Sequence, residues 1–427
     1  MLVGVLLPGN TADPMDPLGE LRSLARTAGA NVVDEIVAKR EKPHPGLYLG
    51  TGKAQQIAER VEQNEIECIV FDNDLSPGQI RDLEKIAGCK VLDRSELILD
   101  IFATHARTHQ SRLQVELAQL EYTYPRLTGM WQHLDRHGGA AAAGGGMGTR
   151  GPGETQIETD RRLVQKRVSM LKDKLADIDR RKLREVRSRN TAFCVCLVGY
   201  TNAGKSTLMN LLTGADTYVA DKLFATLETK TRRWNLDGDA DVLLSDTVGF
   251  VRDLPHHLVA SFRATLEEAI FADLLIHVAD ASHERVDEEI HAVNKVLDEL
   301  GCDRSKLLLV LNKIDKIVDP TLHTVLRRSF PKAISLSAVT GQGAEELIEF
   351  VRREAGGYPV RVKLHANYRN GKLMNYIAQH ADVEHQTYDD AVACIQAVIA
   401  ASKLEQLRQF GDDVVCLTSE TVTEREA

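Results

Sequence analysis

The chain has 427 residues, carries a net charge of −9, and is 43% hydrophobic. A chain of this length divides into about two to four domains, and this composition excludes a wholly disordered protein. No run of about 18 apolar residues occurs, so we expect no membrane-spanning helix and no stable insertion into a membrane. The opening MLVGVLLPGN lacks the positive flank of a signal peptide. We therefore expect a cytoplasmic protein, with peripheral association at a membrane left open.

Residues 1–103 alternate short apolar runs with helical patterns, which is typical of a small α/β domain with a parallel sheet. The expected strands are Leu2–Leu7, Asn31–Ile36, Cys68–Phe71 and Lys90–Leu92. The expected helices are Leu18–Ala28, Lys53–Asn64 and Ser76–Ala87. The segment Gly50–Lys53 is similar to part of a phosphate loop but lacks the full spacing, so a structural turn into a helix is the favoured interpretation.

Residues 104–190 change to helical periodicity, first over Thr104–Thr128. A second helix is expected to begin near Thr155, because Thr155 and Glu158 have the spacing of a capping box. Its apolar positions then alternate by four and three, as in a coiled-coil seam: Val164, Val168, Leu171, Leu175 and Ile178. Two such helices joined by a loop are expected to fold back as an antiparallel hairpin.

This hairpin is basic, with 17 Lys and Arg against 10 Asp and Glu in an otherwise acidic protein, which favours contact with nucleic-acid phosphates. Its tip, residues 138–153, contains eight glycines. A flexible linker is the alternative, but a functional tip is favoured because a long loop at a hairpin end is more often functional. The candidate RNA-binding residues are Arg150, Gly151, Gly153, Arg161, Arg162, Lys166 and Arg167.

Residues 191–356 carry a complete phosphate loop between the apolar strand Phe193–Val198 and the helix Thr207–Leu212. Its glycines let backbone N–H groups face phosphates, and the helix N-terminus adds positive potential. Lys205 is expected to pair with the β- and γ-phosphates, and the Ser206 hydroxyl to bind Mg²⁺. The loop comprises Gly199, Tyr200, Thr201, Asn202, Ala203, Gly204, Lys205 and Ser206.

Three further segments follow at predicted strand ends. Asp246 is placed for Mg²⁺, directly or through water, and the Gly249 N–H for the γ-phosphate. Asp315 can accept the N1 and N2 hydrogens of guanine, and a backbone N–H after Ser337 can meet guanine O6. All four segments in this order predict a guanine-nucleotide hydrolase rather than a general ATPase. The added segments are Asp246-Thr247-Val248-Gly249, Asn312-Lys313-Ile314-Asp315 and Ser337-Ala338-Val339.

A switch segment, residues 221–229, separates the phosphate loop from Asp246. A threonine in such a segment commonly binds Mg²⁺ and the γ-phosphate; the residues alone leave Thr217, Thr226, Thr229 and Thr231 as candidates. Phe250 follows Gly249, where Ras-like enzymes have the glutamine that orients the attacking water. A phenyl ring cannot make that hydrogen bond, so we expect slow basal hydrolysis and a partner, or another residue, that completes the site.

The Gly-Pro-Gly-Glu-Thr-Gln segment at 151–156, with the phosphate loop, Phe224–Leu227 and Asp246–Phe250, resembles the HflX family of ribosome-associated GTPases over essentially the whole chain. The resemblance implies binding to the large ribosomal subunit and its rRNA, splitting of stalled or idle ribosomes, and hydrolysis stimulated by ribosomes. It implies that Thr226 is the switch threonine, acting in catalysis with Lys205 and Gly249. The implied GTP-binding switch residues are Phe224, Ala225, Thr226, Leu227 and Glu228.

Residues 357–427 are expected to form a small α+β domain, with strands at Arg361–Leu364 and Val414–Leu417 around a helix at Tyr388–Leu407. The predicted fold class is multidomain α/β, in which a P-loop G domain has a Ras-like sheet with helices on both faces. Seven scattered cysteines without a Cys-x-x-Cys pair favour buried thiols over zinc or disulfides.

The leading hypothesis is a monomeric GTPase that uses Mg²⁺, converts GTP to GDP and phosphate, and couples this to ribosome splitting or rescue. The alternative is a GTPase of tRNA modification or RNA maturation that acts through the basic hairpin. Such an enzyme would carry a catalytic cysteine near its C-terminus, and no such motif occurs. A signalling switch that binds a protein effector is a third possibility.

Overall fold

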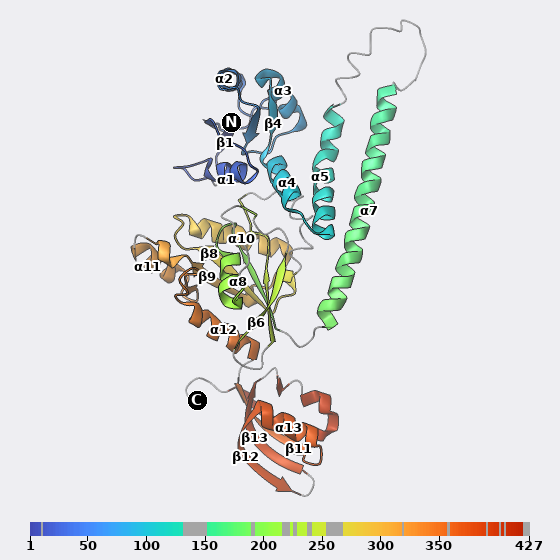
Figure 1. Ribbon diagram of the computed structural model, residues 1–427, viewed down its shortest axis with the longest axis vertical. Coiled ribbons are helices and arrows are strands. Elements are labelled where there is room, and N and C mark those ends of the chain that lie inside the picture. The colour runs from blue at the N-terminus through green and yellow to red at the C-terminus, as the bar shows by residue number, and fades with distance from the viewer. Residues whose placement is uncertain are drawn as a thin grey trace.

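The described residues of the computed structural model form three β-sheets and a long helical hairpin (Figure 1). The predicted multidomain α/β fold class is confirmed. The structure describes the chain except for residues 10–11, 131–151, 189–192, 216–222, 225–228, 237–240, 253–267, 318–319, 357–358, 390–391, 401–402, 405–406 and 422–427. Within this described part, no helix is long and apolar enough to cross a membrane.

The N-terminal sheet is wholly parallel, in the order β2-β1-β3-β4. Apolar residues alternate between its two faces, so α1 and α4 cover one face and α2 and α3 the other. Its strands are β1 (Leu2–Leu6), β2 (Glu35–Lys39), β3 (Cys68–Phe71) and β4 (Lys90–Leu92). Its helices are α1 (Gly19–Thr27), α2 (Thr51–Gln63), α3 (Pro77–Ala87) and α4 (Arg94–His105).

Two features of this sheet differ from the prediction. The strand expected at Asn31–Ile36 begins only at Glu35, because Ile36 and Ala38 are the residues buried against the core while Asp34 pairs with Arg60. Helix α4 was not predicted. It buries seven of its twelve residues and leaves only a narrow exposed face at Asp100, Ala103 and Thr104, because it lies between the N-terminal sheet and the following G domain (Figure 1).

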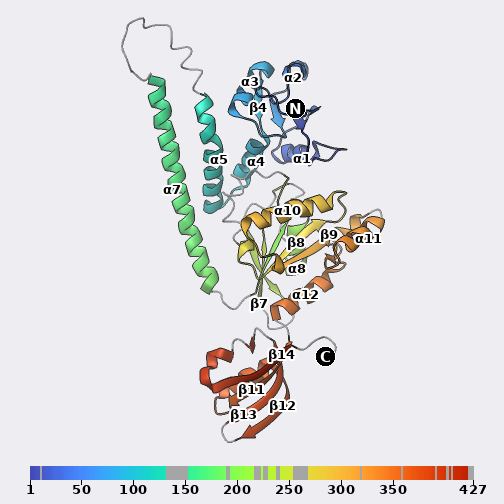
Figure 2. The same ribbon diagram turned by 180° about the vertical axis from the view of Figure 1, so that it is seen from behind.

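The hairpin consists of α5 (His109–Met130) and α7 (Pro152–Ser188), which run side by side in both views (Figures 1 and 2). The expected helix from Thr104 is wrong at its start, since α4 ends at His105 and α5 begins at His109. The capping box is also wrong: α7 already begins at Pro152, whose fixed φ suits a first helical position. The predicted seam is confirmed where Leu113, Leu117, Leu171 and Leu175 are buried together.

The second sheet has the order β10-β9-β8-β5-β7-β6, with only β6 antiparallel to its neighbour. Helices α8 and α12 cover one face and α10 and α11 the other. The strands are β5 (Phe193–Gly199), β6 (Lys230–Asn235), β7 (Asp241–Asp246), β8 (Leu274–Asp280), β9 (Leu307–Asn312) and β10 (Ile334–Ser335). The helices are α8 (Lys205–Thr213), α10 (Val286–Leu300), α11 (Pro320–Ser329), α12 (Ala344–Gly356) and the short 3₁₀ turns η1 (Arg304–Lys306) and η2 (Ile314–Lys316).

The C-terminal sheet is antiparallel, in the order β12-β13-β11-β14. The expected helix at Tyr388–Leu407 is wrong, because alternate residues Ala393, Ile395, Ala397 and Ile399 are buried, the period of a strand. The helix instead follows the first strand, capped by Asn370. The elements are β11 (Pro359–Asn367), α13 (Gly371–His380), β12 (Ala381–Asp389), β13 (Val392–Ala400), η3 (Leu407–Asp413) and β14 (Val414–Thr421).

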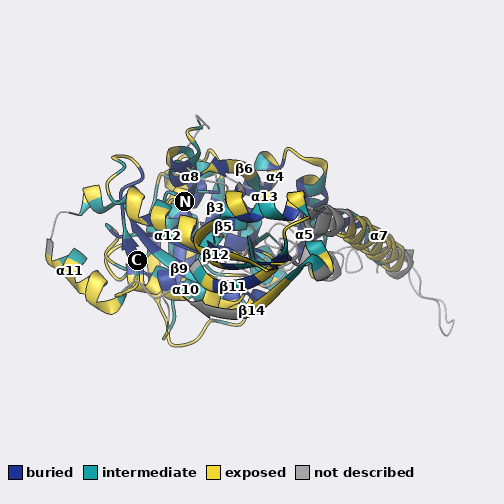
Figure 3. Cartoon of the chain, turned by 90° about the horizontal axis from the view of Figure 1, so that it is seen from below, coloured by how far each residue is buried: buried dark blue, intermediate teal, exposed yellow. Residues whose placement is uncertain are grey.

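Burial differs sharply between these parts. Helix α7 projects from the body of the molecule, and most of its described residues are exposed (Figure 3).

All seven cysteines are free thiols, but only Cys196 and Cys302 are buried and Cys416 is exposed. The expectation of uniformly buried thiols is therefore wrong, because several cysteines lie on strands with one accessible face.

Candidate nucleotide-binding site

The loop from β5 to α8 depends on two close backbone approaches. Gly199 has a φ of 150°, and a Cβ at this position would lie 2.1 Å from the carbonyl oxygen of Val278 on β8. Gly204 has a φ of 95°, and its Cβ would lie 2.3 Å from Asn312 Nδ2. Only glycine meets both the backbone conformation and the space at these positions. The loop is thereby pressed against the ends of two neighbouring strands.

Lys205 begins α8 and turns its ammonium into this loop. Its Nζ donates to the carbonyl oxygens of Gly199 at 3.1 Å and Tyr200 at 2.8 Å, and the residue is 6% exposed. Burial lowers the pKa of Lys205 to about 8, and the nearby Asp246 carboxylate offsets only part of that shift. A cation held inside a ring of backbone groups is suited to an anionic ligand.

Ser206 and Asp246 meet beside the loop. The Ser206 Oγ donates to Asp246 Oδ2 at 2.6 Å, and Asp246 is fully buried at the end of β7. The next residue, Thr247, donates its hydroxyl to the Leu197 carbonyl at 2.7 Å, which fixes β7 against β5. A hydroxyl and a carboxylate brought together in this way are the oxygen ligands that Mg²⁺ prefers.

The segment after Asp246 lies directly on the phosphate loop. The Phe250 carbonyl accepts from the Thr201 N–H at 2.7 Å, and the Phe250 N–H donates to the Gly199 carbonyl at 3.1 Å. A Cβ on Gly249 would lie 2.7 Å from Thr201 Cα, so a side chain there would collide with the loop. The Phe250 ring is 3% exposed and packs against Cys196 of β5 in the core.

The two candidate base-binding segments meet at Asn312. Its Nδ2 donates to the Ala203 carbonyl at 2.8 Å, and its Oδ1 accepts from the Ala338 N–H at 2.9 Å. Asn312 therefore ties the phosphate loop to the segment after β10. Lys313 has a φ of 62° and pairs with Asp280 at 2.7 Å. Of the remaining predicted residues, Ser337 and Ala338 are buried, Ile314 is half-buried, and Asp315 and Val339 are exposed.

Other predicted residues lie away from this loop or outside the described residues. Ala225, Thr226, Leu227 and Glu228 lie outside the described residues, as do Thr217, Arg150 and Gly151. Gly153 falls within α7. On the same helix, Arg162 and Lys166 are exposed and Arg161 is half-buried. Arg167 instead pairs with Glu116 of α5 at 2.6 Å, so it fastens the hairpin.

Phe224 enters the hydrophobic core between the N-terminal sheet and the G domain. Its ring is 2% exposed and meets Phe102 of α4 edge-to-face, with ring centroids 4.7 Å apart. Its φ of 56° is rare for an aromatic residue and costs about 1–3 kcal/mol. Burying a phenylalanine side chain contributes about 1.5–3 kcal/mol, so the strain and the gain are of similar size.

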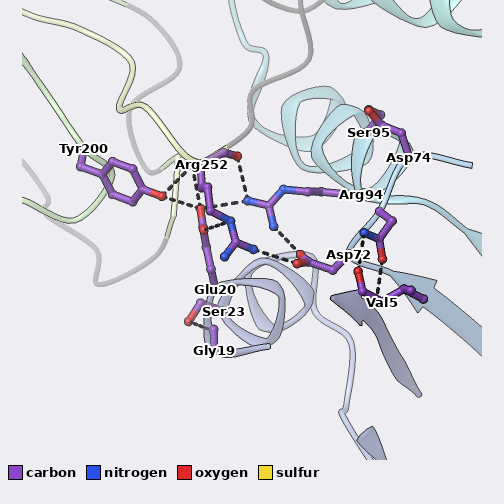
Figure 4. A network of polar contacts seen from close by, with 11 residues as sticks. Val5, Gly19, Glu20, Ser23, Asp72, Asp74, Arg94, Ser95, Tyr200 and Arg252 are labelled. Carbon is purple, nitrogen blue, oxygen red and sulfur yellow. Dashed lines mark hydrogen bonds and ion pairs between the residues drawn. The ribbon is translucent and has the colours of Figure 1, made fainter. Parts of the chain in front are cut away.

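A partly buried polar network joins the phosphate loop to the N-terminal domain (Figure 4). The Tyr200 hydroxyl donates to Glu20 of α1 at 2.9 Å and accepts from the Arg252 N–H at 2.6 Å. Burial raises the pKa of Tyr200 well above its ordinary value, so this hydroxyl stays protonated. Asp72, beyond β3, binds Arg94 at 2.5 Å and Arg252 at 2.7 Å.

Four residues of this network were not predicted from the sequence: Glu20, Asp72, Arg94 and Arg252. Each lies outside a recognisable motif, and the hydrogen bond between Arg252 and Glu20 joins residues 232 positions apart. Tyr200 was assigned only to the phosphate loop, since nothing local indicates a partner for its hydroxyl. Acidic and basic residues make up 27% of the chain, so these four do not stand out in the sequence.

Three family models match consecutive parts of the chain. They are described as GTP-binding GTPase N-terminal, over residues 15–103, GTP-binding GTPase middle region, over 105–189, and 50S ribosome-binding GTPase, over 194–313. Among solved structures, a GTP-binding protein from Sulfolobus solfataricus in complex with GDP is 24% identical, with a TM-score of 0.42, and covers 83% of this chain and 99% of that one.

Two curated relatives match over most of their length. GTPase HflX of Lacrimispora saccharolytica is 40% identical over 408 residues, which is 95% of this chain and 94% of the relative. GTPase HflX of Escherichia coli is 43% identical over 380 residues, or 88% of each chain. Because these relatives match almost end to end, and the nucleotide loop is complete, this chain belongs to the HflX family of GTPases.

Proposed function

We propose that this GTPase binds Mg²⁺–GTP in the loop between β5 and α8 and acts on the large ribosomal subunit. The observation that carries the nucleotide assignment is the double hydrogen bonding of Asn312, which holds the Ala203 and Ala338 backbones together. Phosphate-binding and base-binding segments that are far apart in the chain are thus held side by side. GTP is the substrate, and GDP and phosphate are the products.

Each predicted segment takes a separate part of the nucleotide. Backbone N–H groups at the end of the loop and the start of α8 cradle the phosphates, and Lys205 balances their charge. The Gly249 N–H faces the γ-phosphate, from a position where any side chain would block the loop. The exposed Asp315 carboxylate reads guanine N1 and N2, while the backbone around Ala338 faces guanine O6.

The proposed metal site consists of Ser206 and Asp246, which already lie 2.6 Å apart, with Thr226 from the switch segment. Bound Mg²⁺ would neutralise negative charge on the phosphates of a nucleoside triphosphate. The chain's own part is to hold the Ser206 hydroxyl at the start of α8 and the Asp246 carboxylate at the end of β7. The buried Thr247 hydroxyl keeps that carboxylate in register.

Phe250 cannot orient the attacking water, because its ring is buried in the G domain. We therefore assign slow basal hydrolysis to the isolated chain and propose that the ribosome supplies the missing group. Similar rates with and without large subunits, in a single-turnover assay, would exclude that partner role.

The hairpin is the proposed ribosome-binding element. Arg162 and Lys166 are exposed on α7, which projects away from the other domains (Figure 3). Such side chains attract rRNA phosphates without base specificity, so binding should weaken as salt rises. The match to a family model described as a 50S ribosome-binding GTPase supports the same partner. We further propose that the engaged hairpin drives subunit splitting or rescue.

Co-sedimentation with large subunits tests the partner. Wild-type chain bound to a non-hydrolysable GTP analogue should sediment with the subunits, whereas Arg162→Glu/Lys166→Glu should lose at least tenfold in affinity. Lys53→Glu/Lys85→Glu makes the same charge change at two exposed residues of the N-terminal domain and should bind normally. If both double variants lost affinity for large subunits equally, the loss would reflect the change in net charge and not a specific role of the hairpin.

Splitting needs its own test, because binding alone does not establish it. Deleting residues 144–149 removes four of the eight glycines of the tip and leaves α7, which begins at Pro152, intact. We expect subunit binding to persist through the helices while splitting of 70S ribosomes, followed by light scattering, is lost. Normal splitting by the deletion variant would make this tip a linker.

A further inference from the structure

We propose that Glu20 of α1 is a positioning residue for the nucleotide, because it holds Tyr200 of the phosphate loop together with the backbone that follows Gly249. The N-terminal domain thereby supports a site whose proposed nucleotide-binding residues all come from the G domain. The inference rests on the proposed binding of GTP by Lys205 and Gly249, and it concerns how the chain holds these two residues in place.

The first support is that Tyr200 is held at both of its ends. Its backbone carbonyl accepts from Lys205 Nζ at 2.8 Å, so the position of Tyr200 helps to set that of the ammonium. Its side-chain hydroxyl donates to Glu20 Oε1 at 2.9 Å. Burial, and next the Glu20 carboxylate, raise the pKa of this hydroxyl well above its ordinary value, so it remains a donor. A single residue therefore separates Glu20 from the cation proposed to balance the phosphates.

The second support is that the same carboxylate oxygen binds the segment after Gly249. The Arg252 backbone N–H donates to Glu20 Oε1 at 3.1 Å and to the Tyr200 hydroxyl at 2.6 Å. A Cβ on Gly249 would lie 2.9 Å from Lys205 Nζ, so this segment and the ammonium lie against each other. Glu20 thus joins, at one oxygen atom, the two segments that are proposed to meet the γ-phosphate.

The third support is that the Glu20 carboxylate is itself fixed. Arg94 is buried, and its Nη2 lies 3.0 Å from Glu20 Oε1 and donates to the Arg252 carbonyl at 3.0 Å (Figure 4). Asp72 in turn binds the guanidinium groups of both arginines. Glu20 Oε2 lies farther out, 3.7 Å from Arg252 Nε. The carboxylate therefore acts through one oriented acceptor oxygen, which an amide can also supply.

Nucleotide affinities of the full-length chain test the proposal. In Glu20→Ala, affinity for a non-hydrolysable GTP analogue with Mg²⁺ should fall about tenfold, because both held segments meet the γ-phosphate in the proposed site. Affinity for GDP should fall only about threefold, because GDP lacks the phosphate that Gly249 would bind.

Glu35→Ala is the matched control. Glu35 is also a carboxylate of the N-terminal domain that binds an arginine, since Arg22 Nε lies 2.6 Å from its Oε1. Neither residue belongs to the phosphate loop or to the segment after Gly249. The control should leave both affinities within about twofold of wild type, because separate sites act independently.

Two further variants distinguish positioning from a structural ion pair. Glu20→Gln keeps an acceptor for the Tyr200 hydroxyl and the Arg252 N–H but loses the charge that faces Arg94, so it should bind both nucleotides within about twofold of wild type. Tyr200→Phe removes the hydroxyl, should reproduce the losses of Glu20→Ala, and keeps the proposal testable if Glu20→Ala does not fold. Combining Tyr200→Phe with Glu20→Ala should lower affinity by less than about twofold more, because residues in contact are not additive.

Equal effects of Glu20→Ala and Glu35→Ala on nucleotide affinity would overturn the proposal, as would additive losses when Glu20→Ala and Tyr200→Phe are combined. A Glu20→Gln variant as weak as Glu20→Ala would also overturn it, because the charge and not the acceptor would then matter. Failure of the proposed nucleotide site has a different result. If Lys205→Ala binds GTP and GDP as tightly as wild type, the nucleotide lies elsewhere, whatever the Glu20 variants do.

Discussion

Two loops of this chain pass through a positive-φ glycine into a helix whose first turn contains a lysine, and only one of them forms a site. Gly50 leads into α2 with a φ of 130°, and Gly204 leads into α8 with a φ of 95°. Lys53 on α2 is exposed and donates to Gln56 on its own helix. Lys205 on α8 is buried against the carbonyls of its own loop.

The difference comes from what surrounds each helix start. At α2, the Arg40 side chain donates to the Leu49 carbonyl and lies over Gly50, where a nucleotide phosphate would approach. At α8, Asp246 and Asn312 arrive from the ends of two other strands. The positive end of a helix is therefore a common feature, and groups converging from separate strands turn it into a site.

The largest contrast is expected between Lys205→Ala and Lys53→Ala. Charge-assisted hydrogen bonds to phosphates contribute about 1.5–3 kcal/mol each, so losing two lowers GTP affinity roughly 10²- to 10⁴-fold. Lys53→Ala should bind GTP within twofold of wild type, measured by fluorescent-nucleotide titration. A substantial loss of GTP affinity in Lys53→Ala would show that the α2 loop also takes part in nucleotide binding.

The next contrast concerns base recognition. Asp315 is the candidate base-binding residue beside α8, and no residue beside α2 is assigned that role. Asp315→Asn should lower the affinity for GTP by about 10- to 100-fold, because one acceptor of a charge-assisted pair of hydrogen bonds becomes a donor. The same variant should gain affinity for xanthosine triphosphate, whose position 2 carries an oxygen. Asp303→Asn, at an exposed aspartate before η1, is the matched control. Unchanged GTP affinity would remove Asp315 from the site.

The buried lysine also predicts a pH dependence that the exposed one does not. Its folded-state pKa of about 8 lies below the ordinary 10.5, so the nucleotide-free chain loses this charge as pH rises through 8. GDP affinity should fall between pH 7 and 9, approaching tenfold per pH unit above 8. Stability of the nucleotide-free fold should rise over pH 8–10.5, since the unfolded state then binds more protons. A flat affinity profile would show that Lys205 keeps its proton.

The smallest effect on nucleotide binding is expected for Gly50→Ala. A Cβ there meets the end of the flexible Arg40 side chain at 2.5 Å and must adopt a φ of 130°. We expect a loss of about 1–3 kcal/mol in the free energy of unfolding, measured by urea denaturation, with GTP affinity unchanged. A parallel loss of GTP affinity would couple the two loops.

The nucleotide loops were predictable because each is a local spacing at the end of an apolar strand. Residues 199–206 and Asp246 needed only short windows of sequence. The contact between Phe102 and Phe224 was not predictable, since it joins residues 122 positions apart through shape alone. Likewise, β13 was mistaken for helix because Ala and Ile suit either structure, and its pairing with β11 and β12 decides.

Helix α7 has a mechanical consequence. At 1.5 Å per residue, its 37 residues form a rod about 55 Å long. Only residues 189–192 separate its end from β5, the strand that finishes at Gly199 of the phosphate loop. A tilt of about 10° at that base would carry the far end through roughly 10 Å, given this length. The hairpin therefore has the length of a lever arm, which enlarges any small tilt at its base.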